Sequence, residues 1–127
     1  NLTGEDMVTF NRLGIALRRQ GKWQEAIANY EKALTVAPDD EGLYYNIGLA
    51  QNDGGKKREA LRAMHKALEI NPRFYQNSAN VAFMLGTIFS DNGNSREAAG
   101  YLEAALQVNP EHAEAKAMLE RCRKRSR

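Results

Sequence analysis

Three prolines mark an internal repeat, which constrains the fold of this chain more than any other feature. Pro38, Pro72 and Pro110 lie 34 and 38 residues apart. The segments aligned on these prolines are about 7–40, 41–74 and 79–112. The same residue types recur at matching offsets in all three, including two glycine columns (Gly14, Gly48, Gly86 and Gly21, Gly55, Gly93). A period near 34 residues predicts a stack of similar supersecondary units.

Each segment has the pattern of two helices joined by a tight turn. In the first, Phe10, Leu13 and Leu17 follow helical spacing and form one apolar face. Gly21 suits the left-handed conformation that closes a helix. A second stripe runs from Trp23 to Leu34 and must end before Pro38, whose ring cannot continue a helix.

These residues resemble the tetratricopeptide repeat (TPR) family. The first segment matches its pattern at every signature position, which are Phe10, Leu13, Gly14, Leu17, Ala26, Tyr30, Ala33 and Pro38. The later segments depart from it at Gln51, Met64 and Ala82. The resemblance implies an all-α fold, a right-handed TPR superhelix (α-solenoid) of three helix-turn-helix repeats plus a C-terminal capping helix.

The chain is expected to be a single TPR domain over residues 1–127. Residues 111–124 have apolar positions at helical spacing and are expected to form the helix that caps the open end of the array. The spacing before the third repeat is four residues too long, and Phe74 and Tyr75 lie there. Either the next helix starts a turn early, or Ser78 caps it and both rings lie in a longer turn. The rings would then pack on a neighbouring helix or form an exposed ledge.

The resemblance also indicates a binding surface, because the first helices of TPR repeats line a concave face. The residues beside the packing stripe of these helices are the expected peptide-binding groove: Val8, Asn11, Arg12, Ile15, Arg19, Tyr45, Asn46, Leu49, Asn80, Phe83, Met84 and Thr87. The apolar members do not serve the repeat's own packing stripe, which indicates a protein or peptide partner. The alternative is that a segment of the chain or a second copy covers them.

One partner class is not expected. TPR domains that bind heat-shock chaperone tails resemble one another in a carboxylate clamp built from five positions. The matching residues here are Asn11, Ile15, Asn46, Asn80 and Met84, and only Asn46 agrees. The cationic residues that would bind a terminal carboxylate are missing, so no chaperone-tail clamp is expected.

The net charge of +2 hides a basic tail. Residues 116–127 hold six basic residues and one acid, while the rest of the chain is net acidic. Nucleic acid or an acidic partner at this tail, and homo-oligomer assembly, are the alternative functions. No apolar run approaches the length of a membrane helix, so no membrane role is expected. The single cysteine, Cys122, favours the reducing cytoplasm.

The sequence offers no catalytic, cofactor-binding or metal site. His65, His112 and Cys122 lack the spacing of zinc ligands, and no nucleophile, base and acid can be assembled. We therefore expect a non-enzymatic interaction module without cofactors. The run from Phe10 to Tyr30 is similar to TPR segments attached to receiver-type signalling domains, which implies one domain of a larger bacterial protein.

Overall fold

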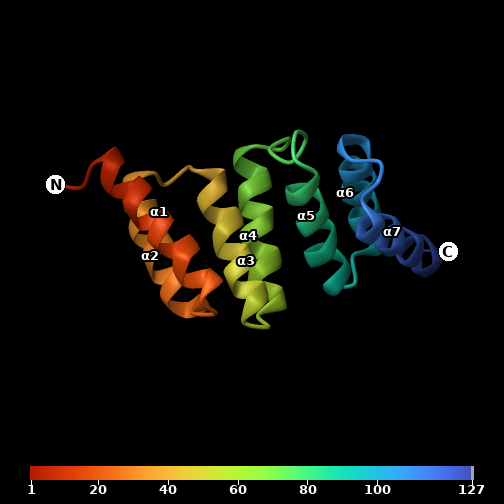
Figure 1. The fold of residues 1–127 in the computed structure, drawn as a ribbon, viewed down its shortest axis with the longest axis horizontal. Coiled ribbons are helices and arrows are strands. Elements are labelled where there is room, and N and C mark those ends of the chain that lie inside the picture. The colour runs from red at the N-terminus through yellow and green to blue at the C-terminus, as the bar shows by residue number, and fades with distance from the viewer. Residues whose placement is uncertain (127) are drawn as a thin grey trace. The chain divides into compact units, whose positions relative to one another are not determined.

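The computed structural model describes residues 1–126, and within them the chain is all α-helical (Figure 1). The helices are α1 (Gly4–Arg19), α2 (Trp23–Val36), α3 (Glu41–Asp53), α4 (Lys57–Ile70), α5 (Ala79–Asp91), α6 (Ser95–Val108) and α7 (Ala113–Arg125). The first six form three helix-turn-helix pairs, and α7 follows them as a seventh helix. This confirms the expected fold class.

The packing divides the chain into two compact units. Unit 1 is Asn1–Pro72 and holds α1 to α4, and unit 2 is Arg73–Arg127 and holds α5 to α7. The sequence analysis treated the chain as one domain. The division falls where the repeat spacing is four residues too long.

The turn inside each repeat is closed by the same backbone motif. Gly21, Gly55 and Gly93 have φ values of 82°, 75° and 82°. The N–H of the residue after each glycine donates to a carbonyl one turn back in the preceding helix, as from Lys22 to Leu17 at 2.9 Å. This is the Schellman arrangement, which favours glycine because other residues rarely adopt a positive φ.

Polar side chains cap the first helix of each repeat and α7, whereas α2, α4 and α6 begin without a side-chain cap. The Thr3 hydroxyl accepts from the Asp6 N–H at 3.4 Å, and the Asp6 carboxylate accepts from the Thr3 N–H at 2.7 Å. This capping box begins α1. Ser78 caps α5 by accepting from the Val81 N–H at 3.2 Å, so the long spacing is a turn and not an extra helical turn.

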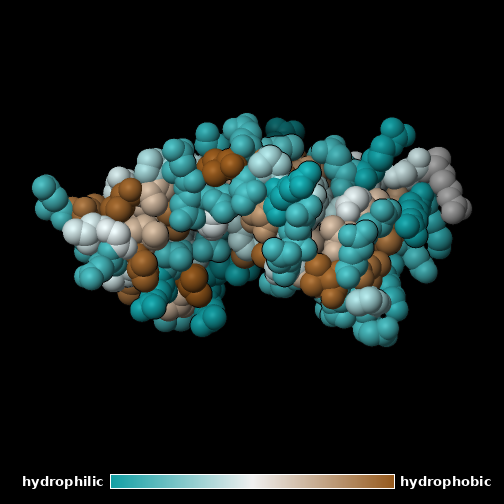
Figure 2. Space-filling model, turned by 90° about the horizontal axis from the view of Figure 1, so that it is seen from above, coloured by the Kyte–Doolittle hydropathy of each residue, from teal (hydrophilic) through white to brown (hydrophobic). Residues whose placement is uncertain are grey.

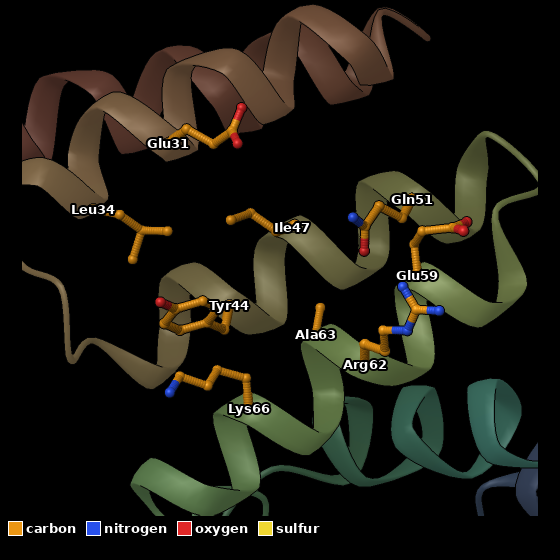
Figure 3. Close-up of a pocket in the computed structure, with 9 residues that line it drawn as sticks. All are labelled: Glu31, Leu34, Tyr44, Ile47, Gln51, Glu59, Arg62, Ala63 and Lys66. Atoms are coloured by element: carbon orange, nitrogen blue, oxygen red, sulfur yellow. The ribbon is translucent and has the colours of Figure 1, made fainter.

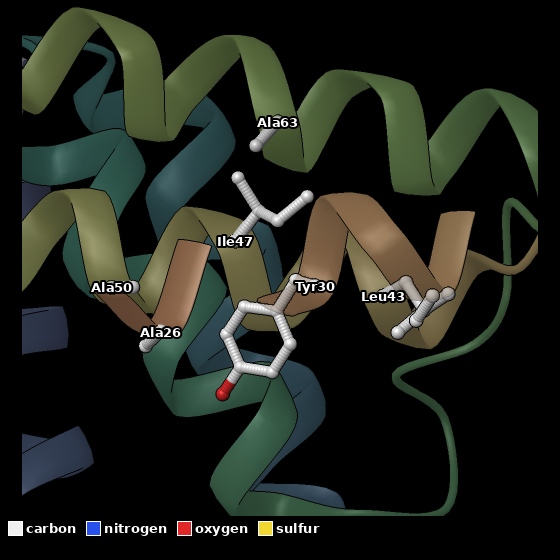
Figure 4. Packing of buried hydrophobic residues seen from close by; sticks show 7 residues of the cluster. Ala26, Tyr30, Leu43, Ile47, Ala50 and Ala63 are labelled. Atoms are coloured by element: carbon white, nitrogen blue, oxygen red, sulfur yellow. The ribbon is translucent and has the colours of Figure 1, made fainter. Parts of the chain in front are cut away.

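The core of unit 1 is built from small residues interleaved with a few large ones (Figure 4). Its buried cluster comprises Ala26, Tyr30, Ala33, Leu43, Ile47, Ala50 and Ala63. The alanines let α2, α3 and α4 approach closely, while Tyr30 and Leu43 fill the space between them. Tyr30 lies directly over Gly14, where no larger residue would fit beside the ring.

One residue of the expected packing face is not buried. Leu13 is 48% exposed, although Ile47, at the matching position of the second repeat, is only 7% exposed. The difference arises because α2 packs against α3 and covers Ile47, whereas no described element of unit 1 covers Leu13 in this way.

Unit 2 packs α5, α6 and α7 around its own core. Leu85, Ile88 and Phe89 of α5 and Leu102 of α6 are at most 1% exposed. The seventh helix contributes Ala115, Leu119 and Cys122, all buried. The buried Cys122 therefore serves as a small packing residue.

Phe74 and Tyr75 pack within unit 2. Both rings are half-buried and meet edge to face, with centroids 6.5 Å apart. Tyr75 in turn lies edge-on to Tyr101 of α6 at 5.1 Å. The extra residues before α5 therefore anchor the turn on α6 and do not form an exposed ledge.

Candidate functional site

The groove residues expected on α1 lie on the surface of unit 1 or at its edge. Val8 is 41% exposed, and Arg12 and Arg19 are exposed. Asn11 is half-buried, and Ile15 is half-buried because it packs against the core of unit 1. This helix thus offers two cations and an apolar side chain to a partner.

On α3, two residues expected at the centre of an open groove are buried. Tyr45 and Leu49 are each only 8% exposed, and this corrects the expectation that they offer apolar surface. The physical reason is that α3 packs against α1, α2 and α4, so the positions beside its main packing stripe are covered too. Burial raises the pKa of Tyr45 to about 12, while the nearby Arg18 guanidinium acts in the opposite direction.

Two asparagines of the expected groove are joined across α1 and α3. The Asn46 Nδ2 donates to Asn11 Oδ1 at 2.9 Å, and both side chains are partly buried. The bond uses one donor of Asn46 and the carbonyl of Asn11. It leaves the Asn11 amide hydrogens and the Asn46 carbonyl oxygen to bond other groups.

An ion pair next to these residues was missed by the sequence analysis. Arg18 donates to Asp53 through Nε at 2.6 Å and through NH2 at 3.2 Å. Their pairing joins the end of α1 to the end of α3. Both side chains are about one-third exposed, so the pair contributes modestly to stability.

The groove residues expected on α5 belong to unit 2, where α7 contacts two of them. The Phe83 ring lies 4.7 Å from the ring of His112. The Thr87 hydroxyl approaches Met118 Sδ at 3.6 Å. Met84 is half-buried, and only Asn80 is exposed. The analysis had assigned α7 a capping role without expecting these contacts.

Most of the basic tail lies within α7, on its exposed side. Arg121, Arg123, Lys124 and Arg125 are all exposed, and Arg123 pairs with Glu103 of α6 at 3.3 Å. Arg127 lies outside the described residues. Figure 2 shows one face of the molecule, where hydrophilic residues cover most of the surface and hydrophobic ones gather in separate small groups.

Two features are absent from the part of the chain that the structure describes. In residues 1–126, no three His, Cys, Asp or Glu side chains come together in a way that could hold a metal ion. None of the described helices combines the length and the apolar character needed to cross a lipid bilayer.

Solved structures of similar fold cover nearly all of the chain. The first TPR of Spaghetti (RPAP3), bound to the HSP90 peptide SRMEEVD, has a TM-score of 0.81 at 21% identity, with 97% of each chain covered. The Arabidopsis OM64 TPR domain has a TM-score of 0.79 at 22% identity, with 95% of this chain and 97% of that chain covered. The second TPR domain of human RPAP3, in complex with the HSP70 peptide SGPTIEEVD, has a TM-score of 0.76 at 19% identity, with 94% and 96% covered. Among curated proteins, no sequence matches the chain.

Family models match the chain in three places. A model described as TPR repeat matches residues 14–55. Two models described as tetratricopeptide repeat match residues 42–74 and 83–119. The matches together include residues from all three helix pairs and from α7. The chain therefore belongs to the tetratricopeptide repeat family.

Proposed function

We propose that this chain is a non-enzymatic protein-interaction module, and that it binds an extended or helical peptide on the α1 and α3 side of unit 1. The observation that carries the proposal is the Asn11–Asn46 pair, which bonds across the two helices at 2.9 Å. Its remaining hydrogen-bonding groups comprise both donors and acceptors. A peptide backbone offers the same two kinds of group at each residue, so the pair can fix a peptide's register.

Charge and apolar surface around the pair support the same binding mode. Arg12 and Arg19 are exposed, and Val8 is 41% exposed on the same helix. Because Tyr45 and Leu49 are buried, the contact energy would come from the rim of α1 rather than from the middle of α3. The exposed arginines would mainly speed association with an acidic peptide.

The similar structures that hold HSP90 and HSP70 peptides support peptide binding as a use of this fold. They do not suggest the same ligand. At the positions of the chaperone clamp this chain has Asn80 and Met84 where a lysine and an arginine are needed. We therefore propose a partner other than a chaperone tail.

The proposal is tested by selecting peptides from a random library on the immobilised chain and measuring their affinity for three variants. The double variant Asn11→Ala/Asn46→Ala should weaken binding at least tenfold. Asn29→Ala is the matched control, since Asn29 lies on α2 and bonds the Glu25 carbonyl of its own helix at 3.0 Å. Deletion of residues 123–127 should change little.

The proposal fails if the selected peptides bind the asparagine double variant as tightly as the original chain. Binding that disappears only on deletion of the tail would instead support an electrostatic partner at the basic C-terminal end. Circular dichroism of each variant shows whether the fold is retained.

A further inference from the structure

A pocket lies in unit 1 between α2 and α4 and over α3 (Figure 3). Its volume is about 330 Å³, which falls at the lower end of the range of small-ligand pockets. Leu34, Tyr44, Ile47 and Ala63 give it apolar walls. It shares no residue with the Asn11–Asn46 surface and is independent of the proposed function.

The pocket exists where the second repeat lacks two rings that the third repeat has. Gln51 and Ala63 both line it, and the residues at their matching positions in the third repeat are Phe89 and Tyr101. Those two rings pack together with centroids 4.9 Å apart. The helix pairs α3–α4 and α5–α6 share one pattern of small and large residues. Because Gln51 and Ala63 are smaller than the two rings, they leave a space about the size of an aromatic side chain.

The amide of Gln51 adds a polar requirement to this space. Its Oε1 atom is buried and accepts no hydrogen bond from any described residue. In Figure 3 the amide lies beside Ile47, with its oxygen on the side of Ala63. A buried acceptor normally has a donor. An O–H or N–H group carried on the edge of a bound ring would supply one once a rotation of the half-buried Gln51 side chain brings this oxygen to the pocket surface.

Charged side chains of both signs surround the mouth of the pocket. Glu31, Glu59, Arg62 and Lys66 line it and are exposed. Lys66 also lies 6.0 Å from the centre of the Tyr44 ring. Two carboxylates and two cations around an apolar space complement an aromatic residue that has charged residues beside it in the sequence. A polypeptide can offer such neighbours, whereas a free aromatic molecule cannot.

We propose that this pocket binds a tyrosine or tryptophan side chain of a partner polypeptide. The ring takes the space that Phe89 and Tyr101 fill in the third repeat, and its hydroxyl or indole N–H donates to Gln51. Charged residues beside the aromatic residue contact the carboxylates and cations at the mouth.

The first test uses N-acetyl-tyrosine amide and N-acetyl-phenylalanine amide as probes, titrated into the full ¹⁵N-labelled chain. The tyrosine probe should give saturable shifts at Gln51 and Ala63, with an affinity at least threefold above that of the phenylalanine probe. No saturable shift in unit 1, or equal affinities of the two probes, would overturn the proposal.

Two variants locate the binding. Ala63→Tyr copies the third repeat and should abolish the shifts, while Ala117→Tyr, at an exposed site on α7, should leave them intact. Gln51→Leu copies Leu17 of the first repeat and should remove the preference for tyrosine while retaining ring binding. If Ala63→Tyr does not fold, Gln51→Leu still decides, because an unchanged preference in that variant refutes the role of the amide.

The polypeptide part is tested with the capped tripeptides Lys-Tyr-Glu and Ala-Tyr-Ala at low salt. The charged peptide should bind at least threefold more tightly, and the gain should fall with added salt. Equal affinities would show that the charged mouth does not recognise a polypeptide, and would overturn that part.

Discussion

Tyr75 lies edge-on against Tyr101, with the ring centroids 5.1 Å apart and the planes at 89°. The contact joins the segment that lengthens the repeat spacing to the middle of α6. Phe74 also meets Tyr75, and Tyr101 packs against Phe89, so four rings form a continuous cluster in unit 2. The burial of Tyr101 raises its pKa, with Tyr75 and Glu97 acting in the same direction.

Loss of this contact should loosen unit 2 alone. Tyr75→Leu keeps apolar volume but removes the ring pairing. We therefore expect the free energy of unfolding of unit 2 to fall by about 0.5–1.5 kcal/mol. The measurement is native-state hydrogen exchange of α6 amides. Gln76→Leu, at the exposed neighbouring residue, serves as the control. If both variants exchange like the original chain, the turn is not anchored by Tyr75.

Replacing the glycines at the helix crossings by alanine should lower the stability by different amounts. A Cβ at Gly14 would meet three atoms of the Tyr30 ring, which is rigid and only 1% exposed. A Cβ at Gly48 would stand 2.7 Å from Met64 Cε, the far end of a flexible side chain. Gly14→Ala should therefore cost about 1–3 kcal/mol despite the better helix propensity of alanine, and Gly48→Ala should cost less. Urea unfolding measures both, and the reverse order would contradict the packing described for Tyr30.

The buried hydroxyl of Tyr45 predicts a loss of stability in alkali. Because the folded pKa is about 12 and the ordinary value is 10, folding favours the protonated form. This contribution is fully present below pH 10 and disappears as the pH rises through 12, with a total of about 2–3 kcal/mol. Tyr45→Phe removes it while leaving Tyr30 and Tyr101 to titrate. Urea midpoints at pH 8 and pH 11.5 should fall further for the original chain than for the variant, and parallel curves would argue against a buried hydroxyl.

The seventh helix should be required for unit 2, whereas the tail should not be. Deleting residues 123–127 removes exposed charges and the Arg123–Glu103 pair, and we expect a change of less than about 1 kcal/mol. Deleting residues from Glu111 onward removes Ala115, Leu119 and Cys122 from the core of unit 2 and should unfold it or cause aggregation. Thermal unfolding followed by circular dichroism compares the two. An equally stable, soluble chain ending at Pro110 would show that α7 is not a cap.

The repeating features of this fold could be predicted from the sequence, because each depends on residues a fixed distance apart. The glycine turns, the small residues at helix crossings and the capping helix follow from that period. Contacts that join different columns of the repeat could not be predicted. Arg18 meets Asp53 one position beyond its period match, and Phe83 meets His112, the N-cap residue of α7.

The candidate site was predicted less well than the fold. Helical spacing placed Tyr45 beside the packing stripe of α3. The spacing does not tell how many other helices pack against α3, and that number decides whether Tyr45 is buried. The sequence does contain a pattern that could have predicted the pocket over α3. In the second repeat, Gln51 and Ala63 occupy the positions that match Phe89 and Tyr101 of the third repeat. Two smaller side chains at neighbouring positions indicate a space between the helices.

Carboxylate recognition provides the last prediction. The peptide SRMEEVD is the one bound to the first TPR of Spaghetti, and its last residue is an aspartate. The five positions matching the chaperone clamp here are Asn11, Ile15, Asn46, Asn80 and Met84, and none is a lysine or arginine. A terminal carboxylate binds strongly only where charged donors meet it. Any attraction of this acidic peptide to the exposed Arg12 and Arg19 should therefore be weak, should fall with salt and should not depend on the chain end. Fluorescence anisotropy with the free-acid and the amidated peptide measures this, and we expect equal affinities. An affinity for the free acid tenfold or more above that of the amide would mean that other cations of this chain form a clamp.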